Sequence, residues 1–528
     1  MPVLQDGVPG SWNTVRVSSE GGVRATAPAS ATVLGVLFLT FLDTTIVSVT
    51  LGDLESDLSA GVIALQWVVD AYALVFAAFL LVGGTLGDRF GRRRVMLAGI
   101  VVFAIGSLMC ALAPGVALVV AGRAVMGLGA AASEPGTLSV VRQLHPDRRA
   151  RARALGAWSA VSGLALAAGP VLGGLLVAAG GWRSVFWFNL AVAAVAAVCV
   201  RAFVPESRDP RPGRVDVAGA LLGAVGIGAV VFAAITGEYR GFGSAEVIVC
   251  FAVGGLCLLA FVPVERRVRA PMLDLRLVAR PVVSSALFTA FAAYFGVFAI
   301  FFFTALYLDI GRAYSGARLA GMFAPMAAAI VLGGLLAGPW VARTGSRTPT
   351  VAGCVLSAAG MLLARFELGA GAGLSFGWLA AALAVAGLGF GVTVVPVTSA
   401  VLTHVPAERS GMAASATNTA RQFGTVVGVA ALGAIVNEHL TSAVDRAFRG
   451  PFLGSARGEV LGILETGGGS GRFDLTRLVK QRFFRPFVDA FLHGVQLALL
   501  VAVVLVLLAG LIAAFVRDPD AARSAPER

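Results

Sequence analysis

Long apolar runs separated by short polar segments dominate the chain. A helix needs about 20 mostly apolar residues to cross roughly 30 Å of hydrocarbon at about 1.5 Å per residue. Fourteen runs meet this length, so the pattern predicts an all-α polytopic membrane protein. The predicted spans are residues 31–51, 65–86, 94–113, 116–141, 154–179, 185–204, 215–236, 244–264, 283–305, 319–341, 348–365, 375–400, 417–437 and 487–516.

Arginines gather in alternate junctions between the spans, and this bias predicts the orientation of the chain. The positive-inside rule places short Arg-rich junctions in the cytoplasm. The junctions after the second, fourth, sixth and eighth spans are Arg-rich, whereas the junction after the first carries Asp53, Glu55 and Asp57. The chain is therefore predicted to lie in the inner membrane with both termini in the cytoplasm. Residues 438–486 conflict with the rule, because this segment is predicted outside yet carries several basic residues.

An internal repeat relates the second and tenth spans. Because the related spans are eight apart, the simplest architecture is two six-helix bundles with two helices inserted between them, a plan known in transporters. The repeat consists of Gly84, Arg89, Gly91 and Arg93 and, at the same spacing, Gly338, Arg343, Gly345 and Arg347. The predicted parts are a cytoplasmic tail (1–30), an N-terminal six-helix bundle (31–204), the inserted helices with linkers (205–282), a C-terminal six-helix bundle (283–516) with an extracytoplasmic loop (438–486), and a second cytoplasmic tail (517–528).

Composition narrows the classes of function. Hydrophobic residues make up 58% of the 528 positions and charged residues only 13%, which is typical of a chain whose solvent is the bilayer. The net charge of +12 does not indicate nucleic-acid binding, because the arginines lie in membrane junctions. The five cysteines lack metal-ligand spacing, so no metal is predicted. Lys480 is the only lysine among many arginines, a composition typical of actinobacteria.

Four segments resemble motifs of a known family. The segment 84–93 (GTLGDRFGRR) resembles the signature that follows the second span in the major facilitator superfamily. Residues 42–47 (LDTTIV), 123–129 (RAVMGLG) and 163–174 resemble motifs of its fourteen-span drug/proton antiporter branch. This resemblance covers essentially the whole chain and implies the major facilitator fold. The second-half copy of the signature departs from the first in having Ala342 opposite Asp88.

The junction after the second predicted span is a candidate conformational gate. Glycines allow a tight turn and a close helix approach, and Asp88 can meet a positive helix N-terminus or an arginine. Such contacts could hold one conformation closed. The alternative is that the arginines only fix topology. The candidate gate comprises Gly84, Asp88, Arg89, Gly91, Arg92 and Arg93.

The fifth predicted span carries a second candidate element. Pro170 removes a backbone hydrogen bond within the span, and Gly163, Gly169, Gly173 and Gly174 leave a thin helix face for close packing. The family resemblance implies that this element is the antiporter motif, which is associated with antiport rather than uptake. Ordinary packing glycines are the alternative.

Ionisable residues inside the predicted spans are candidates for proton coupling, because a charge near the bilayer centre costs at least about 2.5–3.5 kcal/mol. Asp43 and Arg123 are expected at similar depth, so Arg123 is predicted to pair with Asp43, or with Asp70 near the same level. Glu134 lies about 16 Å further along the helix that carries Arg123, too far for a direct pair. Arg421 lies nearer a predicted span end and is expected to snorkel.

A buried carboxylate that alternates between an arginine partner and an apolar environment binds and releases a proton. Asp43 is therefore predicted as the leading proton or cation site and Arg123 as its modulator. Glu134 or Asp70 is predicted as a second carboxylate. A static structural ion pair is the alternative.

Aromatic residues near the ninth and tenth spans are candidates for substrate contact. Tyr294, Phe298, Phe302 and Tyr307 supply apolar surface suited to a lipophilic or aromatic small molecule. Lipid-facing or packing roles are the alternative for each ring.

Together these features predict proton-coupled efflux of drug-like small molecules or antibiotics by alternating access, with self-resistance in an antibiotic producer as one setting. The alternative is proton-coupled transport of an ordinary metabolite or siderophore. An enzyme is not predicted, because the spans hold no catalytic constellation, and a nucleotide-driven pump is disfavoured because no phosphate-binding loop occurs. The predicted partners are the substrate and the lipid bilayer. No cofactor, nucleic acid, nucleotide or obligate protein partner is predicted, and the proton gradient is the expected energy source.

Overall fold

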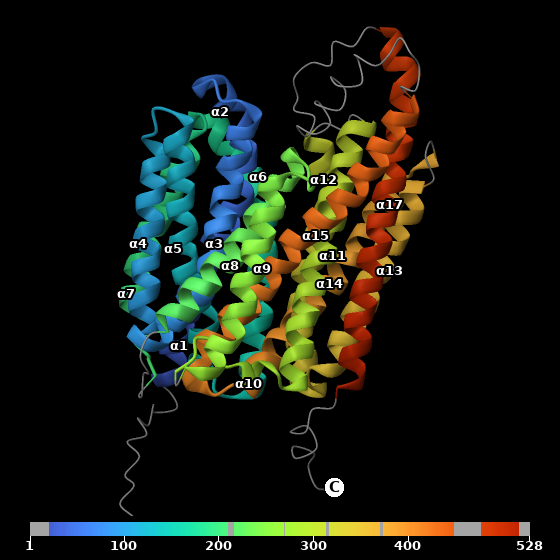
Figure 1. Cartoon of the computed structure of the whole chain (residues 1–528). Helices are drawn as coiled ribbons and strands as arrows, with labels where there is room; N and C mark the ends of the chain where they lie inside the picture. Colours follow the sequence, from blue (N-terminus) through green and yellow to red (C-terminus); the bar gives the residue numbers. More distant parts are fainter. Residues whose placement is uncertain are drawn as a thin grey trace, which may run out of the picture.

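The computed structural model describes residues 21–209, 216–268, 270–312, 316–369, 373–447 and 477–516. Long helices run side by side through the molecule (Figure 1). Helices suit a membrane because each backbone N–H and C=O group is paired within its own segment. Within the described residues, thirteen helices are long and apolar enough to cross a membrane, and a bent helix brings the number to fourteen. The predicted all-α architecture of up to fourteen spans is confirmed.

We call the first six spans the N-terminal half. The first span is built from three consecutive helical segments, and each later span is one helix. The half comprises α1 (Gly21–Ile46), the 3₁₀ turn η1 (Val47–Thr50), α2 (Leu51–Leu58), α3 (Val62–Phe90), α4 (Arg92–Ala111), α5 (Val116–Leu144), α6 (Arg148–Gly180) and α7 (Arg183–Phe203).

We call the last six spans the C-terminal half. The two halves lie on opposite sides of the view in Figure 1. The C-terminal half comprises α11 (Pro281–Arg312), α12 (Gly316–Thr344), α13 (Arg347–Gly369), α14 (Phe376–His404), the 3₁₀ turn η3 (Ala407–Arg409), α15 (Ser410–Ala447) and α17 (Arg477–Phe515).

Between the halves in sequence come α8 (Val217–Arg240), α9 (Ala245–Arg267) and the short α10 (Leu275–Val278). Helix α8 packs against α3 of one half and α15 of the other, and α9 packs against α8. The inserted pair therefore lies beside the junction of the two halves, as Figure 1 shows in green.

Several helix boundaries differ from the predictions. Helix α1 begins at Gly21, so part of the predicted tail 1–30 is helical. Helix α15 begins at Ser410 and runs to Ala447, and α17 begins at Arg477, so both ends of the predicted loop 438–486 are helical. The remainder of that loop and the tail 517–528 lie outside the described residues. Hydropathy detects only the apolar part of a helix, and these helices continue into polar sequence.

Helix α1 begins and α17 ends at the same face of the bundle, which we call the terminal face (Figure 1). The two junctions of the predicted repeat lie at this face and share one backbone form. Gly91 follows α3 with φ of 109°, and Gly345 follows α12 with φ of 80°. These values favour glycine, because other residues are strained there.

The two halves meet most extensively along two helix pairs, α3 with α15 and α6 with α12, and α5 with α15 and α6 with α14 also pack together. Glycines bring the backbones together in the first two pairs. Gly84 of α3 lies against the carbonyl of Gly411 in α15, and a Cβ on Gly338 of α12 would lie 2.7 Å from the carbonyl oxygen of Ala152 in α6. Small residues allow this close approach between membrane helices.

Candidate functional site

A buried carboxylate joins the two halves at the terminal face. Asp88, near the end of α3, accepts hydrogen bonds of 2.9 Å from the backbone N–H groups of both Gly411 and Met412, at the start of α15. Its Oδ1 also forms a 2.8 Å salt bridge with Nη2 of Arg92. The first N–H groups of a helix lack intrahelical acceptors and carry partial positive charge. Asp88 thus has both of the partners expected for it, a helix N-terminus and an arginine.

Further arginines of the N-terminal half reach the same region of the C-terminal half. Nη2 of Arg92 donates to the carbonyl oxygen of Ala407 at 3.1 Å. Arg142, at the end of α5, donates to the carbonyl oxygen of Val405 at 2.7 Å. We call these contacts, together with those of Asp88, the terminal lock.

The remaining candidate gate residues act within the N-terminal half or beside it. The backbone N–H of Arg93 donates to Oε1 of Glu206 at 3.2 Å, in the linker after α7, and a Cβ on Gly91 would meet the same carboxylate. Arg89 lies against the ring of Phe90. Glu206 was missed in the sequence because nothing in a polar linker marks one carboxylate as a partner of α4.

A second buried ion pair lies in the middle of the N-terminal half. Nη1 of Arg123 in α5 donates to Oδ2 of Asp43 in α1 at 2.5 Å, and both side chains are fully buried. The other carboxylate oxygen accepts from Nδ2 of Asn189 in α7 at 2.7 Å. Nε of Arg123 donates to the carbonyl oxygen of Val68 at 2.9 Å, and its guanidinium covers the ring of Tyr72. The first of the two partners predicted for Arg123 is the one found.

The two other candidate carboxylates are outside this pair. Asp70 is half-buried in α3 and has no hydrogen-bond or ion-pair partner among the described residues. Glu134 in α5 is 2% exposed, and within the same part of the chain its Oε2 has no hydrogen-bond partner. Both therefore present acidic groups inside the spans that the protein itself leaves incompletely paired.

Arg421 is buried inside the bundle, so the expectation that it snorkels is wrong. It is 3% exposed and lies well inside α15, because this helix begins at Ser410, before the predicted start. Its Nη1 donates to Oδ1 of Asn418 at 2.8 Å and its Nη2 to Oγ1 of Thr398 at 2.5 Å. Its guanidinium also lies over the ring of Trp158 in α6, 5.0 Å from the centroid.

The glycines of the predicted antiporter motif divide between two neighbours. A Cβ on Gly163 would lie 2.8 Å from Cγ2 of Ile330 in α12. Gly169 lies against Thr45, and a Cβ on Gly173 would lie 2.9 Å from the carbonyl oxygen of Ile46. Gly174 has open space. Two of the four glycines, Gly169 and Gly173, therefore pack α6 against the first span, and Gly163 contacts the other half.

Helix α6 is bent by 40° between Leu166 and Ala168, about one turn before Pro170. Proline has no N–H, so the carbonyl of Leu166, four residues earlier, loses its helical donor. The hydroxyl of Thr45 in α1 donates to this oxygen at 3.1 Å. A neighbouring helix thereby supplies the hydrogen bond that the Leu166 carbonyl oxygen loses at the bend.

The candidate substrate aromatics all lie on α11, including Tyr307, which was expected at a junction. Tyr294 stacks with Phe298 at 6.1 Å between centroids and is 5.6 Å from the Arg421 guanidinium. Tyr307 is buried and stacks against α17, and Phe302 is 41% exposed. The four rings are not one cluster.

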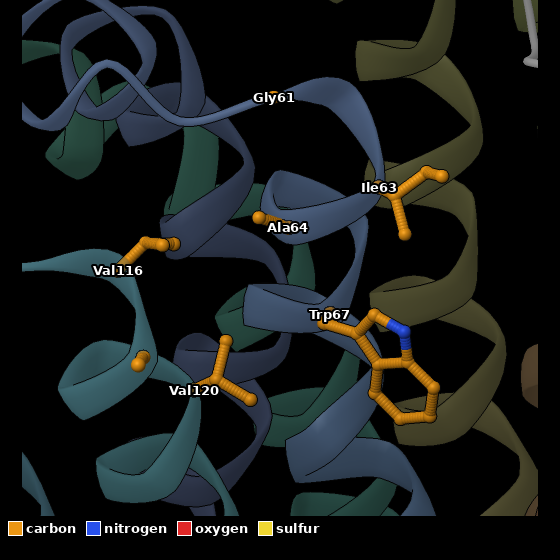
Figure 2. A pocket seen from close by; sticks show the side chains of 7 residues that line it. Gly61, Ile63, Ala64, Trp67, Val116 and Val120 are labelled. Atoms are coloured by element: carbon orange, nitrogen blue, oxygen red, sulfur yellow. The ribbon is translucent and has the colours of Figure 1, made fainter.

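A cavity of about 840 Å³ lies at the ends of α3 and α5 opposite the terminal face (Figure 2). Its lining is almost entirely apolar, and Trp67 also packs on Phe232 of α8. The lining residues are Gly61, Ile63, Ala64, Trp67, Val116, Ala117 and Val120.

Comparison with known proteins gives a consistent result. A family model described as Major Facilitator Superfamily matches residues 33–429. The multidrug resistance protein Stp of Mycobacterium tuberculosis is 34% identical over 478 residues, which cover 89% of this chain and 88% of Stp. The puromycin resistance protein pur8 of Streptomyces alboniger is 34% identical, covering 76% of this chain and 80% of its own.

The fold also matches a solved structure. The crystal structure of the human organic anion transporter MFSD10 has a TM-score of 0.60 to this chain at 15% identity. The match covers 91% of this chain and 99% of that one. At this identity the likeness concerns the fold alone.

Proposed function

The chain belongs to the Major Facilitator Superfamily, and from this premise we propose that it exports drug-like small molecules or antibiotics in exchange for protons. It is accordingly a multi-pass membrane transporter and not an enzyme. The names of its relatives, which describe multidrug and puromycin resistance, support export as the direction of transport. Self-resistance in an antibiotic-producing actinobacterium fits the same relatives and the Arg-rich composition.

Alternating access is the proposed mechanism. The polar contacts of the terminal lock hold the halves together at one face, and the apolar cavity lies towards the other. Breaking the lock would let the halves pivot along the α3–α15 and α6–α12 contacts. We place the terminal face in the cytoplasm, because the Arg-rich junctions lie there. The locked form would then be closed to the cytoplasm.

The observation that carries proton coupling is the set of acidic groups inside the spans. Asp43 and Glu134 are buried, and Asp70 is half-buried. Ionisable residues within a membrane are costly and are typically retained for ion or proton pathways. Arg123 pairs with Asp43 and would stabilise its ionised form.

The proposed substrate is lipophilic or aromatic. The cavity lining offers apolar surface and few polar groups. Tyr294 and Phe298 offer stacked rings nearer the centre of the bundle, next to the Arg421 guanidinium. Rings beside a few polar anchors are typical of small-molecule sites.

Transport into inverted membrane vesicles tests this proposal. Vesicles that contain the protein and matched vesicles without it would be given puromycin, several lipophilic dyes and an imposed pH gradient. We expect accumulation that requires both the protein and the gradient, and that ends when a protonophore collapses the gradient. Accumulation that is indifferent to the gradient would refute proton coupling, and a failure to accumulate puromycin or any of the dyes would refute drug efflux.

A further inference from the structure

The Asp43–Arg123 pair lies entirely within one half of the molecule. Its members come from α1 and α5, and its further partners, Asn189 and the Val68 carbonyl, come from α7 and α3. A pivoting of one half against the other leaves every one of these distances unchanged. The pair therefore does not respond to the movement that alternating access requires.

Glu134 and Arg421 lie on two helices, α5 and α15, that pack against each other between the two halves. Glu134 lies on α5 of the N-terminal half, and Arg421 lies on α15 of the C-terminal half. The charge of Arg421 acts on the Glu134 carboxylate. No salt bridge joins them among the described residues, and the Arg421 guanidinium donates hydrogen bonds to neutral oxygens of its own half, those of Asn418 and Thr398.

Trp158 contacts both the helix that carries Glu134 and the side chain of Arg421. Its Nε1 donates to Oγ1 of Thr137 at 3.1 Å, one turn after Glu134 on α5. Its ring lies beneath the Arg421 guanidinium. Because α5 and α6 belong to the same half, Trp158 moves with Glu134, and a pivot of the halves would change the position of Arg421 relative to both.

Within the described residues, two buried tyrosines are the other titratable groups that interact with Glu134. Tyr72, on α3, interacts electrostatically with Glu134 and with the Asp43–Arg123 pair. Tyr294, on α11, interacts with Glu134 and Arg421. Each phenol is neutral when protonated, so Arg421 is the nearby charge from the C-terminal half that can control the ionisation of Glu134.

We propose that Glu134 is the carboxyl group that binds the transported proton, and that Arg421 of the opposite half sets whether Glu134 is ionised. The inference rests on proton-coupled transport as proposed above. A carboxylate beside a guanidinium stays ionised, whereas an isolated buried carboxylate takes up a proton. The arrangement of the halves that brings Arg421 closer releases the proton, and the arrangement that separates them binds one. The step is a simple protonation of a carboxylate oxygen and needs no other reactant.

Two transport measurements separate this coupling role from a structural role. Gradient-driven accumulation needs net proton movement, whereas exchange of labelled for unlabelled substrate without a gradient does not. We expect Glu134→Gln and Arg421→Gln to lose accumulation and keep exchange, with an exchange rate that no longer follows pH in Glu134→Gln. Arg421→Lys retains the charge and should retain accumulation.

Removing one buried charge leaves the other uncompensated, so either single variant could fold poorly. The double variant Glu134→Gln/Arg421→Gln removes both charges and should be recovered at wild-type amounts, exchange substrate and show no coupling. Size-exclusion profiles would confirm equal folded protein. Retained accumulation in a variant that lacks Glu134 or the Arg421 charge would overturn the inference, as would parallel loss of exchange in all variants. If the wild-type protein itself shows no gradient-driven accumulation, the proposed function fails instead.

Discussion

The terminal lock makes a quantitative prediction for Asp88→Asn. The Asp88 carboxylate accepts hydrogen bonds of 2.9 Å from the backbone N–H groups of Gly411 and Met412 in the other half, and of 2.8 and 3.1 Å from the guanidinium of Arg92 in its own half. Hydrogen bonds to a charged group contribute about 1.5–3 kcal/mol each, and neutral ones about 0.5–1.5 kcal/mol. Only the contacts with Gly411 and Met412 cross between the halves, so the neutral amide loses about 1 kcal/mol at each of them, or about 2 kcal/mol in total. Because about 1.4 kcal/mol changes an equilibrium tenfold, the locked arrangement should lose about thirtyfold in population relative to the open one.

Spin-label distances across the terminal face measure this population. Arg149→Cys at the start of α6 and Thr348→Cys at the start of α13 place one label on each half, in a background without the five native cysteines. Both positions are exposed. We expect a longer distance to become the main component in Asp88→Asn, with lower gradient-driven transport at equal protein amounts.

Asp57→Asn is the matched control. Asp57 forms a 2.6 Å salt bridge with Arg183 inside the N-terminal half, so its loss removes a carboxylate without touching the lock. The distribution of spin-label distances in Asp57→Asn should match that of the wild type. An unchanged distribution in Asp88→Asn as well would show that the lock does not hold the halves together, and the reasoning would be wrong.

Two further predictions concern stability. Gly169→Ala places a methyl group onto Thr45, and the overpacking should cost about 1–3 kcal/mol and lower the thermal midpoint of the purified protein. Gly174→Ala meets open space and should leave the midpoint unchanged, so equal midpoints in the two variants would exclude the packing role of Gly169. Burial and the nearby charge of Arg153 hold the pKa of His145 below the ordinary 6.5. The unfolded chain therefore binds more protons than the folded one just below that pH, so the free energy of unfolding should fall as pH drops through 6.5. Thermal melting measured as a function of pH should show a smaller fall in His145→Gln.

The spans and the Asp43–Arg123 pair could be predicted because both follow from the positions of residues along single helices. Apolar run length locates a span, and the depths of Asp43 and Arg123 follow from counting residues along two helices of known direction. Arg421 was misplaced for the same reason, since its depth was counted from a predicted helix start that is too late by seven residues. Asn189 was missed because a single amide in an apolar run gives no sign of its partner, which lies on a helix far away in sequence.

Helix α15 connects the two charged sites that the halves share. Its first turn supplies the Gly411 and Met412 N–H groups of the terminal lock, and Arg421 lies about 15 Å further along the same helix. A helix that moves as a rigid body transmits a displacement of one end to the other, so opening of the lock would shift Arg421 relative to Glu134. Coupling between two sites is reciprocal, and a proton on Glu134 would then favour one state of the lock as much as the lock favours one protonation state of Glu134. In this view Asp88 and Glu134 report on the same movement, one at the terminal face and the other in the middle of the bundle.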